Sequence, residues 1–192
     1  MKTCKWVADK NYIYAIIIRY GILIISALMI FTNELIAELI SCPKRLTEAP
    51  KVVAPRKSSS KTEFRMESQD GKYSFGGYIT QNSSFQENFS IGLIFYPREE
   101  KGRFCLLRCN GLHGEHISAP HHSYCHQHTV DADDLNNGIK VERYISRVGY
   151  ATVEDAIQYY IRHINLRVED RQKYFPPPGS QPEFPFDNKD LA

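Results

Sequence analysis

Six of the seven histidines in this 192-residue chain lie between Cys109 and His128. Imidazole titrates near neutral pH and is the commonest metal ligand in proteins, so this stretch is well suited to acid–base or metal chemistry. Two of the five cysteines, Cys109 and Cys125, also fall within it. The sequence therefore predicts one histidine-rich site, which the remaining elements must position.

His126 and His128 are separated by one residue in a segment, 123–130, that we expect to be a strand. Side chains two positions apart in a strand point to the same face of the sheet. A loop that must return beside this strand carries two more histidines. The predicted ligands of a zinc-like divalent ion are therefore His113, His116, His126 and His128, with Cys109 or Cys125 as a substitute. Their spacing matches no standard structural zinc motif.

The same strand histidines also suit catalysis without a metal. His126 and His128 are candidates for the general base and general acid of a phosphodiester cleavage, and Arg108 is a candidate for stabilising the developing charge. The alternative for Arg108 is an ordinary salt bridge with Glu115 or with an acid in the segment 131–134. For the histidines, the alternative is a polar core satisfied by backbone carbonyls.

Two neighbouring histidines and two thiols receive lesser roles. His121 and His122 follow Pro120 in a loop where adjacent side chains diverge and water screens both, so we expect them to matter less than the strand pair. Cys109 and Cys125 are candidate nucleophiles beside histidine, but a small, partly buried thiol is the commoner role for such residues.

Composition and missing motifs weigh against several classes of protein. The formal net charge of +2 gives no strong electrostatic footprint for nucleic-acid binding. The chain lacks a phosphate-binding Gly-Lys-Ser/Thr loop, a dinucleotide fingerprint and a serine nucleophile elbow. An odd number of cysteines clustered near histidines is unlike a secreted disulfide framework, which favours a reducing compartment.

The N-terminal segment 1–42 is hydrophobic. Its stretch 12–31 is interrupted by one charge, Arg19, and is about long enough to cross a membrane as a helix. We expect either a single-pass anchor with the body of the protein in the cytoplasm, or translation that starts at Met29. In the second case the chain opens with a short amphipathic helix containing Leu35 and Leu39.

The rest of the chain predicts an α+β domain between a linker and a tail. Residues 43–61 are basic and rich in Pro and Ser, which is typical of a linker. Alternating apolar residues in 62–167 predict an antiparallel meander of about five strands, with a hairpin turn at Asp70-Gly71. The capping signature Thr152-Val-Glu-Asp then begins an amphipathic helix that packs on the sheet. The Pro-rich tail 168–192 is expected to be disordered.

The order of these segments resembles a family of small bacterial proteins with a domain of unknown function, met near prophage or toxin–antitoxin genes. The residues that carry the resemblance are Cys42-Pro-Lys44, Leu107-Arg-Cys-Asn-Gly-Leu-His113, His126-Gln-His128 and Tyr150-Ala-Thr-Val-Glu-Asp-Ala-Ile157. The resemblance covers about residues 33 to 166. It implies a cytoplasmic α+β domain and supplies no catalytic residues.

Two functions remain open at this point. The first is a metal-dependent or acid–base hydrolase of the phosphodiesterase type that acts on RNA or a nucleotide. The second is a non-catalytic interaction module, antitoxin-like or adaptor-like, that binds a partner protein through a sheet edge or a helix. Histidine density favours the first, and the absence of a known catalytic signature favours the second.

Overall fold

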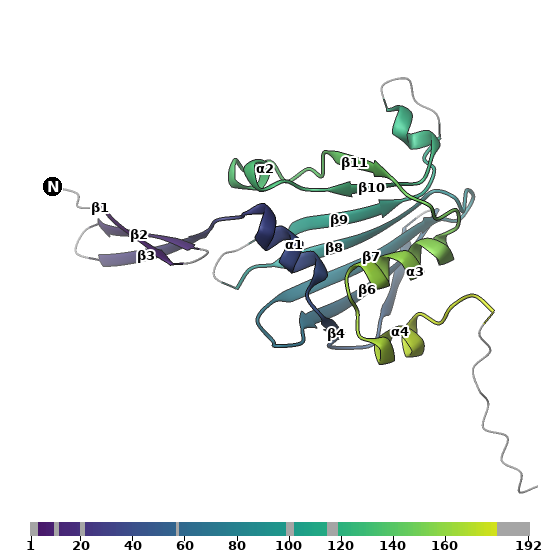
Figure 1. The fold of residues 1–192 in the computed structure, drawn as a ribbon, viewed down its shortest axis with the longest axis horizontal. Helices are drawn as coiled ribbons and strands as arrows, with labels where there is room; N and C mark the ends of the chain where they lie inside the picture. Colours follow the sequence, from purple (N-terminus) through teal and green to yellow (C-terminus); the bar gives the residue numbers. More distant parts are fainter. Residues whose placement is uncertain are drawn as a thin grey trace, which may run out of the picture.

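One antiparallel sheet carries helices on one of its faces (Figure 1). The structure is a computed structural model that describes residues 4–9, 12–19, 22–56, 58–98, 102–114 and 119–179. The α+β class and the antiparallel meander are confirmed. The expected number of about five strands was too low, because this sheet has 8 strands.

The strands follow one another in an almost sequential meander. The order across the sheet is β11-β10-β9-β8-β7-β6-β4, and β5 also pairs with β6. Their bounds are β4 (Lys44–Leu46), β5 (Lys51–Arg56), β6 (Ser59–Ser68), β7 (Ser74–Asn82), β8 (Phe89–Tyr96), β9 (Phe104–Asn110), β10 (His126–Thr129) and β11 (Tyr144–Arg147). The predicted turn between β6 and β7 is confirmed, with Gly71 at a positive φ of 70°.

The sheet has one apolar face and one polar face, because side chains alternate along each strand. Strand β8 shows this alternation: Phe89, Ile91, Leu93 and Phe95 are all buried. The helices α1 (Asn33–Ser41), α3 (Val153–His163) and α4 (Val168–Tyr174) cover this face. We call the opposite side of the sheet the open face.

Helix α3 begins where the capping signature predicts. The Thr152 side chain accepts a hydrogen bond from the backbone N–H of Asp155, which satisfies one of the free donors of the first turn. The helix then buries Ala156, Tyr160 and Ile161 against the sheet. The Tyr160 hydroxyl donates to the Gly92 carbonyl at 3.0 Å, so the helix is fixed to β8 by a directional bond as well as by burial.

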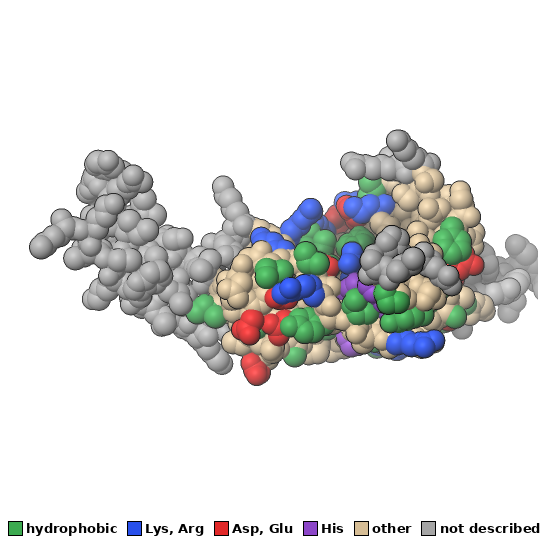
Figure 2. Space-filling model, turned by 90° about the horizontal axis from the view of Figure 1, so that it is seen from above, with side chains coloured by type: hydrophobic (Ala, Val, Ile, Leu, Met, Phe, Trp, Pro, Cys, Tyr) green, Lys and Arg blue, Asp and Glu red, His purple; other side chains and the backbone are tan. Residues whose placement is uncertain are grey.

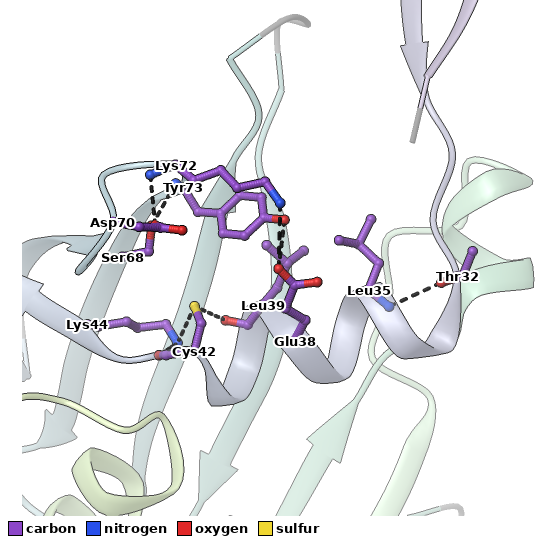
Figure 3. A network of polar contacts seen from close by, with 10 residues as sticks. All are labelled: Thr32, Leu35, Glu38, Leu39, Cys42, Lys44, Ser68, Asp70, Lys72 and Tyr73. Atoms are coloured by element: carbon purple, nitrogen blue, oxygen red, sulfur yellow. Dashed lines mark hydrogen bonds and ion pairs between the residues drawn. The ribbon is translucent and has the colours of Figure 1, made fainter. Parts of the chain in front are cut away.

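A buried ammonium group joins the ends of α1 and α3, and Figure 3 shows it beside Cys42 at the end of α1. Lys44 is 1% exposed, and its Nζ donates to the carbonyls of Ile40, Cys42 and Ile164 at 2.8, 2.9 and 3.1 Å. The last carbonyls of a helix have no partner within the helix, and their partial negative charge favours a cation. Burial lowers the pKa of Lys44 to about 8, so the group is still mainly protonated at neutral pH.

The N-terminal segment does not form the predicted hydrophobic helix. Instead, β1 (Cys4–Asp9), β2 (Tyr12–Arg19) and β3 (Ile22–Met29) form a separate antiparallel three-stranded sheet. The segment is rich in isoleucine, whose branched Cβ favours strands over helices, and this explains the difference. Within the described residues, no helix has the length and apolar character needed to span a membrane.

The segment expected to be a linker is largely part of the sheet. Strands β4 and β5 and the start of β6 lie within residues 43–61. Pro55 is compatible with a strand here because β5 pairs only with β6, and a proline is tolerated at a sheet edge. Residues 43–61 are therefore mainly strands of the sheet rather than a linker.

The first part of the expected disordered tail is folded. Helix α4 places Asp170 at 5% exposure, where its carboxylate accepts the backbone N–H of Leu46 at 2.9 Å. The ring of Phe175 packs edge-on against Phe64, with ring centroids 5.4 Å apart. These contacts join the tail to β4 and β6 across more than 100 residues, which local polarity does not reveal. Residues 180–192 lie outside the described part of the chain.

Replacing the buried ammonium tests whether it stabilises the fold. We expect Lys44→Met to lower the free energy of unfolding by about 2–3 kcal/mol, because carbonyls at two helix ends lose their donor. Lys72→Met is the matched control: its side chain is 53% exposed, and a change within about 0.5 kcal/mol is expected. Urea unfolding measures both. An unchanged midpoint for Lys44→Met would contradict this role.

Candidate metal centre

The register between β9 and β10 brings four polar side chains together on the open face. His126 pairs with Asn110, and His128 pairs with Arg108. Directly opposite residues of an antiparallel pair project from the same face. The register is held by the Tyr150 hydroxyl, which lies 2.9 Å from the His126 carbonyl and 3.2 Å from the Asn110 carbonyl.

Backbone carbonyls fix the tautomers of both strand histidines. The Nδ1 atom of His126 lies 2.8 Å from the Tyr124 carbonyl oxygen, and Nδ1 of His128 lies 2.8 Å from that of Glu142. A carbonyl oxygen only accepts, so each Nδ1 carries the proton and each Nε2 retains its lone pair. Metal-binding histidines are oriented in the same way, with one nitrogen donating to a carbonyl or carboxylate and the other binding the ion.

His121 completes a triad with the strand pair. It lies on a short 3-10 helix, η1 (Pro120–Ser123), with its ring centroid 5.0 Å from that of His126 and 5.6 Å from that of His128. The candidate ligand atoms of the three residues all lie within 4.8 Å of one another. Tetrahedral zinc needs nitrogens about 3.3 Å apart, since Zn–N is about 2.0–2.1 Å. His121 is only partly buried, so it is the ligand free to approach.

The other predicted ligands occupy different places. His113 lies beside the triad, its ring centroid 5.7 Å from that of His126, and its Nδ1 is 3.0 Å from Asn88 Oδ1. His116 lies outside the described residues. The structure thus groups His121, rather than His113, with the strand pair. His122 contacts His121 and His113 by its ring edge but is not part of the triad. Histidine side chains reach the surface between basic and apolar side chains (Figure 2).

Burial keeps these imidazoles neutral. Desolvation lowers the pKa of His126 and of His113 to about 4, and it also lowers the pKa of His128 and of His121. A neutral imidazole is the form that binds a metal. The same shift makes His126 a poor general acid at pH 7, because almost none of it is protonated. The geometry therefore supports the metal site better than the metal-free acid–base pair.

Arg108 is paired with a residue that the sequence did not indicate. Its guanidinium lies 3.3 Å from a carboxylate oxygen of Glu142 and not against the segment 131–134, while Glu115 lies outside the described residues. In that segment, Asp134 pairs with Arg143 instead. Glu142 thus has two contacts at the site, since its carbonyl also holds His128.

Two buried polar atoms beside the triad have no partner within the described part of the chain: Arg108 Nε and Asn110 Oδ1. Asn110 itself is only 4% exposed, and its amide nitrogen makes one long contact of 3.4 Å with His126 Nε2. Buried polar atoms are nearly always hydrogen-bonded, to protein or to a bound molecule. An unmatched donor and an unmatched acceptor on one strand therefore mark this part of the open face as a place for a ligand.

The two cysteines belong to the core and not to the metal centre. Burial raises the pKa of Cys109 to about 12 and also raises that of Cys125. Both remain thiols at neutral pH, so neither is an activated nucleophile. Cys109 pairs with Gln127 and therefore points to the helix-covered face. In the part of the chain described, no cysteine joins the histidine triad.

Comparisons of the chain with protein-family models, with curated proteins and with solved structures returned no match. The resemblance to a bacterial family therefore stays a prediction. What the chain defines by itself is an α+β protein with three converging histidines on the open face of an antiparallel sheet.

The buried histidines should make the metal-free protein sensitive to acid. Below about pH 6.5 the unfolded chain takes up protons on histidine, whereas His113 and His126 stay neutral in the fold until about pH 4. The unfolded state thus binds more protons in this window, so stability falls as the pH drops from 6.5 towards 4. Urea unfolding at pH 7 and pH 5 should show this loss, and His113→Asn should reduce it. A variant with the wild-type pH profile would contradict the assignment.

Proposed function

We propose that the protein is a metal-dependent hydrolase of the phosphodiesterase type, in which His121, His126 and His128 hold a zinc-like divalent ion. The observation that supports this most strongly is the fixed tautomer of both strand histidines. Each donates Nδ1–H to a backbone carbonyl, which leaves the lone pair on Nε2; in His126 this atom is also contacted by the Asn110 amide nitrogen at 3.4 Å, a long contact that an ion would replace. The second supporting observation is that each of the three histidines offers a ring nitrogen within 4.8 Å of those of the other two.

Three protein ligands leave one coordination position open, which is typical of catalytic rather than structural zinc. A zinc ion in such a site lowers the pKa of a bound water to about 7 and supplies the nucleophile for hydrolysis. The protein's own contribution lies on β9. The guanidinium of Arg108, whose side chain is 33% exposed, stabilises an anionic substrate oxygen, and the unmatched amide oxygen of Asn110 accepts a hydrogen bond from a group bound at the site.

A specific observation also supports the second candidate, an interaction module. Among the described strands, β11 pairs with β10 alone, and all four of its residues are exposed. Tyr144 and Ile145 are 53% and 41% exposed. An exposed edge strand with apolar side chains can bind an extended segment of a partner protein by adding a strand to the sheet. This surface and the histidine triad are compatible in one protein.

Metal content tests the proposed centre. Purified protein incubated with zinc and then desalted should retain one zinc per chain, measured by elemental analysis. His121→Ala, His126→Ala and His128→Ala should each lose it, because two imidazoles hold zinc far more weakly than three. His122→Ala is the matched control from the same segment and should keep the metal. Equal loss in the control, or zinc retained without His126, would contradict the site.

Activity tests the hydrolytic role. The zinc-loaded protein should cleave bis(p-nitrophenyl) phosphate, and Arg108→Gln should lower kcat by about 10²-fold, the usual effect of removing one charge-stabilising donor. Arg65→Gln is the matched control. Arg65 lies on β6, on the same face of the sheet as Arg108, and its replacement should leave kcat unchanged. No cleavage by protein that holds its zinc would eliminate the hydrolase and leave the interaction module.

A further inference from the structure

A hollow of about 610 Å³ opens on the same face as the histidine triad. We call it the basic hollow, because its lining includes Lys61, Arg103 and Lys140. Its volume lies in the range that holds a small molecule. The hollow meets the metal centre at Glu142, which lines it and also holds His128 through a backbone carbonyl.

A row of paired residues connects Tyr78, in the lining of the basic hollow, with His128 of the triad. Tyr78, Gly92, Arg108 and His128 are consecutive partners across β7, β8, β9 and β10, so they form one row on the open face. The row spans about 14 Å, three strand spacings. The Tyr78 ring lies across Gly92, where an added Cβ would come within 2.3 Å of it. Glycine is therefore required at this point, and the absence of a side chain lets the tyrosine reach along the row towards Arg108.

The charge of the lining favours an anion. Among its described residues, Glu142 is the one acid, and its carboxylate is already paired with Arg108. The two other titratable groups of the floor stay neutral: burial raises the pKa of Tyr78 to about 12 and raises that of Cys105. Lys61 is partly compensated by Glu63 at 2.6 Å, whereas the ammonium of Lys140 lies over the Phe104 ring, 4.7 Å from its centroid.

We infer that the basic hollow binds a phosphorylated small molecule of about nucleotide size. Arg103 and Lys140 bind its phosphate oxygens, for which guanidinium and ammonium donors give strong, charge-assisted hydrogen bonds. Tyr78 and Thr80 also line the hollow and add no charge to it; the Thr80 hydroxyl donates to the Ser90 carbonyl at 3.2 Å. The inference rests on the proposed hydrolase only where it makes this molecule the enzyme's substrate. Binding of the phosphate in the hollow requires no metal ligand.

The test is a calorimetric titration of the zinc-loaded protein with adenosine 5′-monophosphate and with adenosine. The monophosphate should bind, and adenosine should not. Arg103→Gln/Lys140→Gln should weaken monophosphate binding at least about tenfold, since two charge-assisted contacts are lost. Arg45→Gln/Arg65→Gln is the matched control: it removes two charges from the same face, on β4 and β6, outside the hollow.

Three results would overturn the inference: no monophosphate binding up to about 1 mM, equal binding of adenosine, or equal weakening in the control variant. Zinc content is measured on the same samples, which separates the two claims. If zinc is retained and the monophosphate does not bind, the hollow assignment fails and the metal centre stands. If zinc is lost but phosphate binding still depends on Arg103 and Lys140, the hollow assignment stands and the proposed hydrolase fails.

Discussion

The pairing of β10 with β9 determines what chemistry the open face can support. Because side chains alternate along a strand, a slip of one residue would turn His126 and His128 into the helix-covered core and expose Gln127 instead. The Tyr150 hydroxyl opposes such a slip by its contact with the His126 carbonyl. A second tyrosine acts from α3, where the Tyr159 hydroxyl donates to Gln127 Oε1 at 3.0 Å. The core face thus fixes the position of the candidate site on the opposite face.

Stability and chemistry are divided between the two faces of the sheet. The helix-covered face holds nearly all of the large buried side chains. Buried Lys44 joins the C-terminal ends of α1 and α3 there, so the two helices form one layer. The open face is then free to carry polar side chains. Three of its buried polar atoms, Ser90 Oγ, Arg108 Nε and Asn110 Oδ1, have no hydrogen-bond partner among the described residues, which is a cost that a ligand beside the histidine triad would reduce.

Local rules predicted much of this structure from the sequence. Alternation along β8, the turn at Gly71 and the cap at Thr152 each depend on a few neighbouring residues, and the structure has all three. The shared face of His126 and His128 follows from the period of a strand in the same way.

The features that were missed depend on contacts between distant residues. His121 joins the triad because a loop folds back over β10, and Glu142 reaches Arg108 from the segment before β11. The tail was expected to be disordered, yet α4 is held by Leu46 and Phe64 from the other end of the domain. No periodicity in the sequence encodes such pairs. Asn110 was also missed as a site residue. Its position two residues after Arg108 in a predicted strand was the one available signal, because such residues share a face of the sheet.

Zinc K-edge X-ray absorption spectroscopy of the zinc-loaded protein identifies the ligands of the ion. A centre held by the histidine triad gives three imidazole nitrogens, recognised by their outer-shell ring scattering, and one or two oxygen ligands at about 2.0–2.1 Å. A sulfur shell at about 2.3 Å would mean that cysteine binds the ion. Either that result or a coordination sphere without imidazole would contradict a metal centre built from His121, His126 and His128.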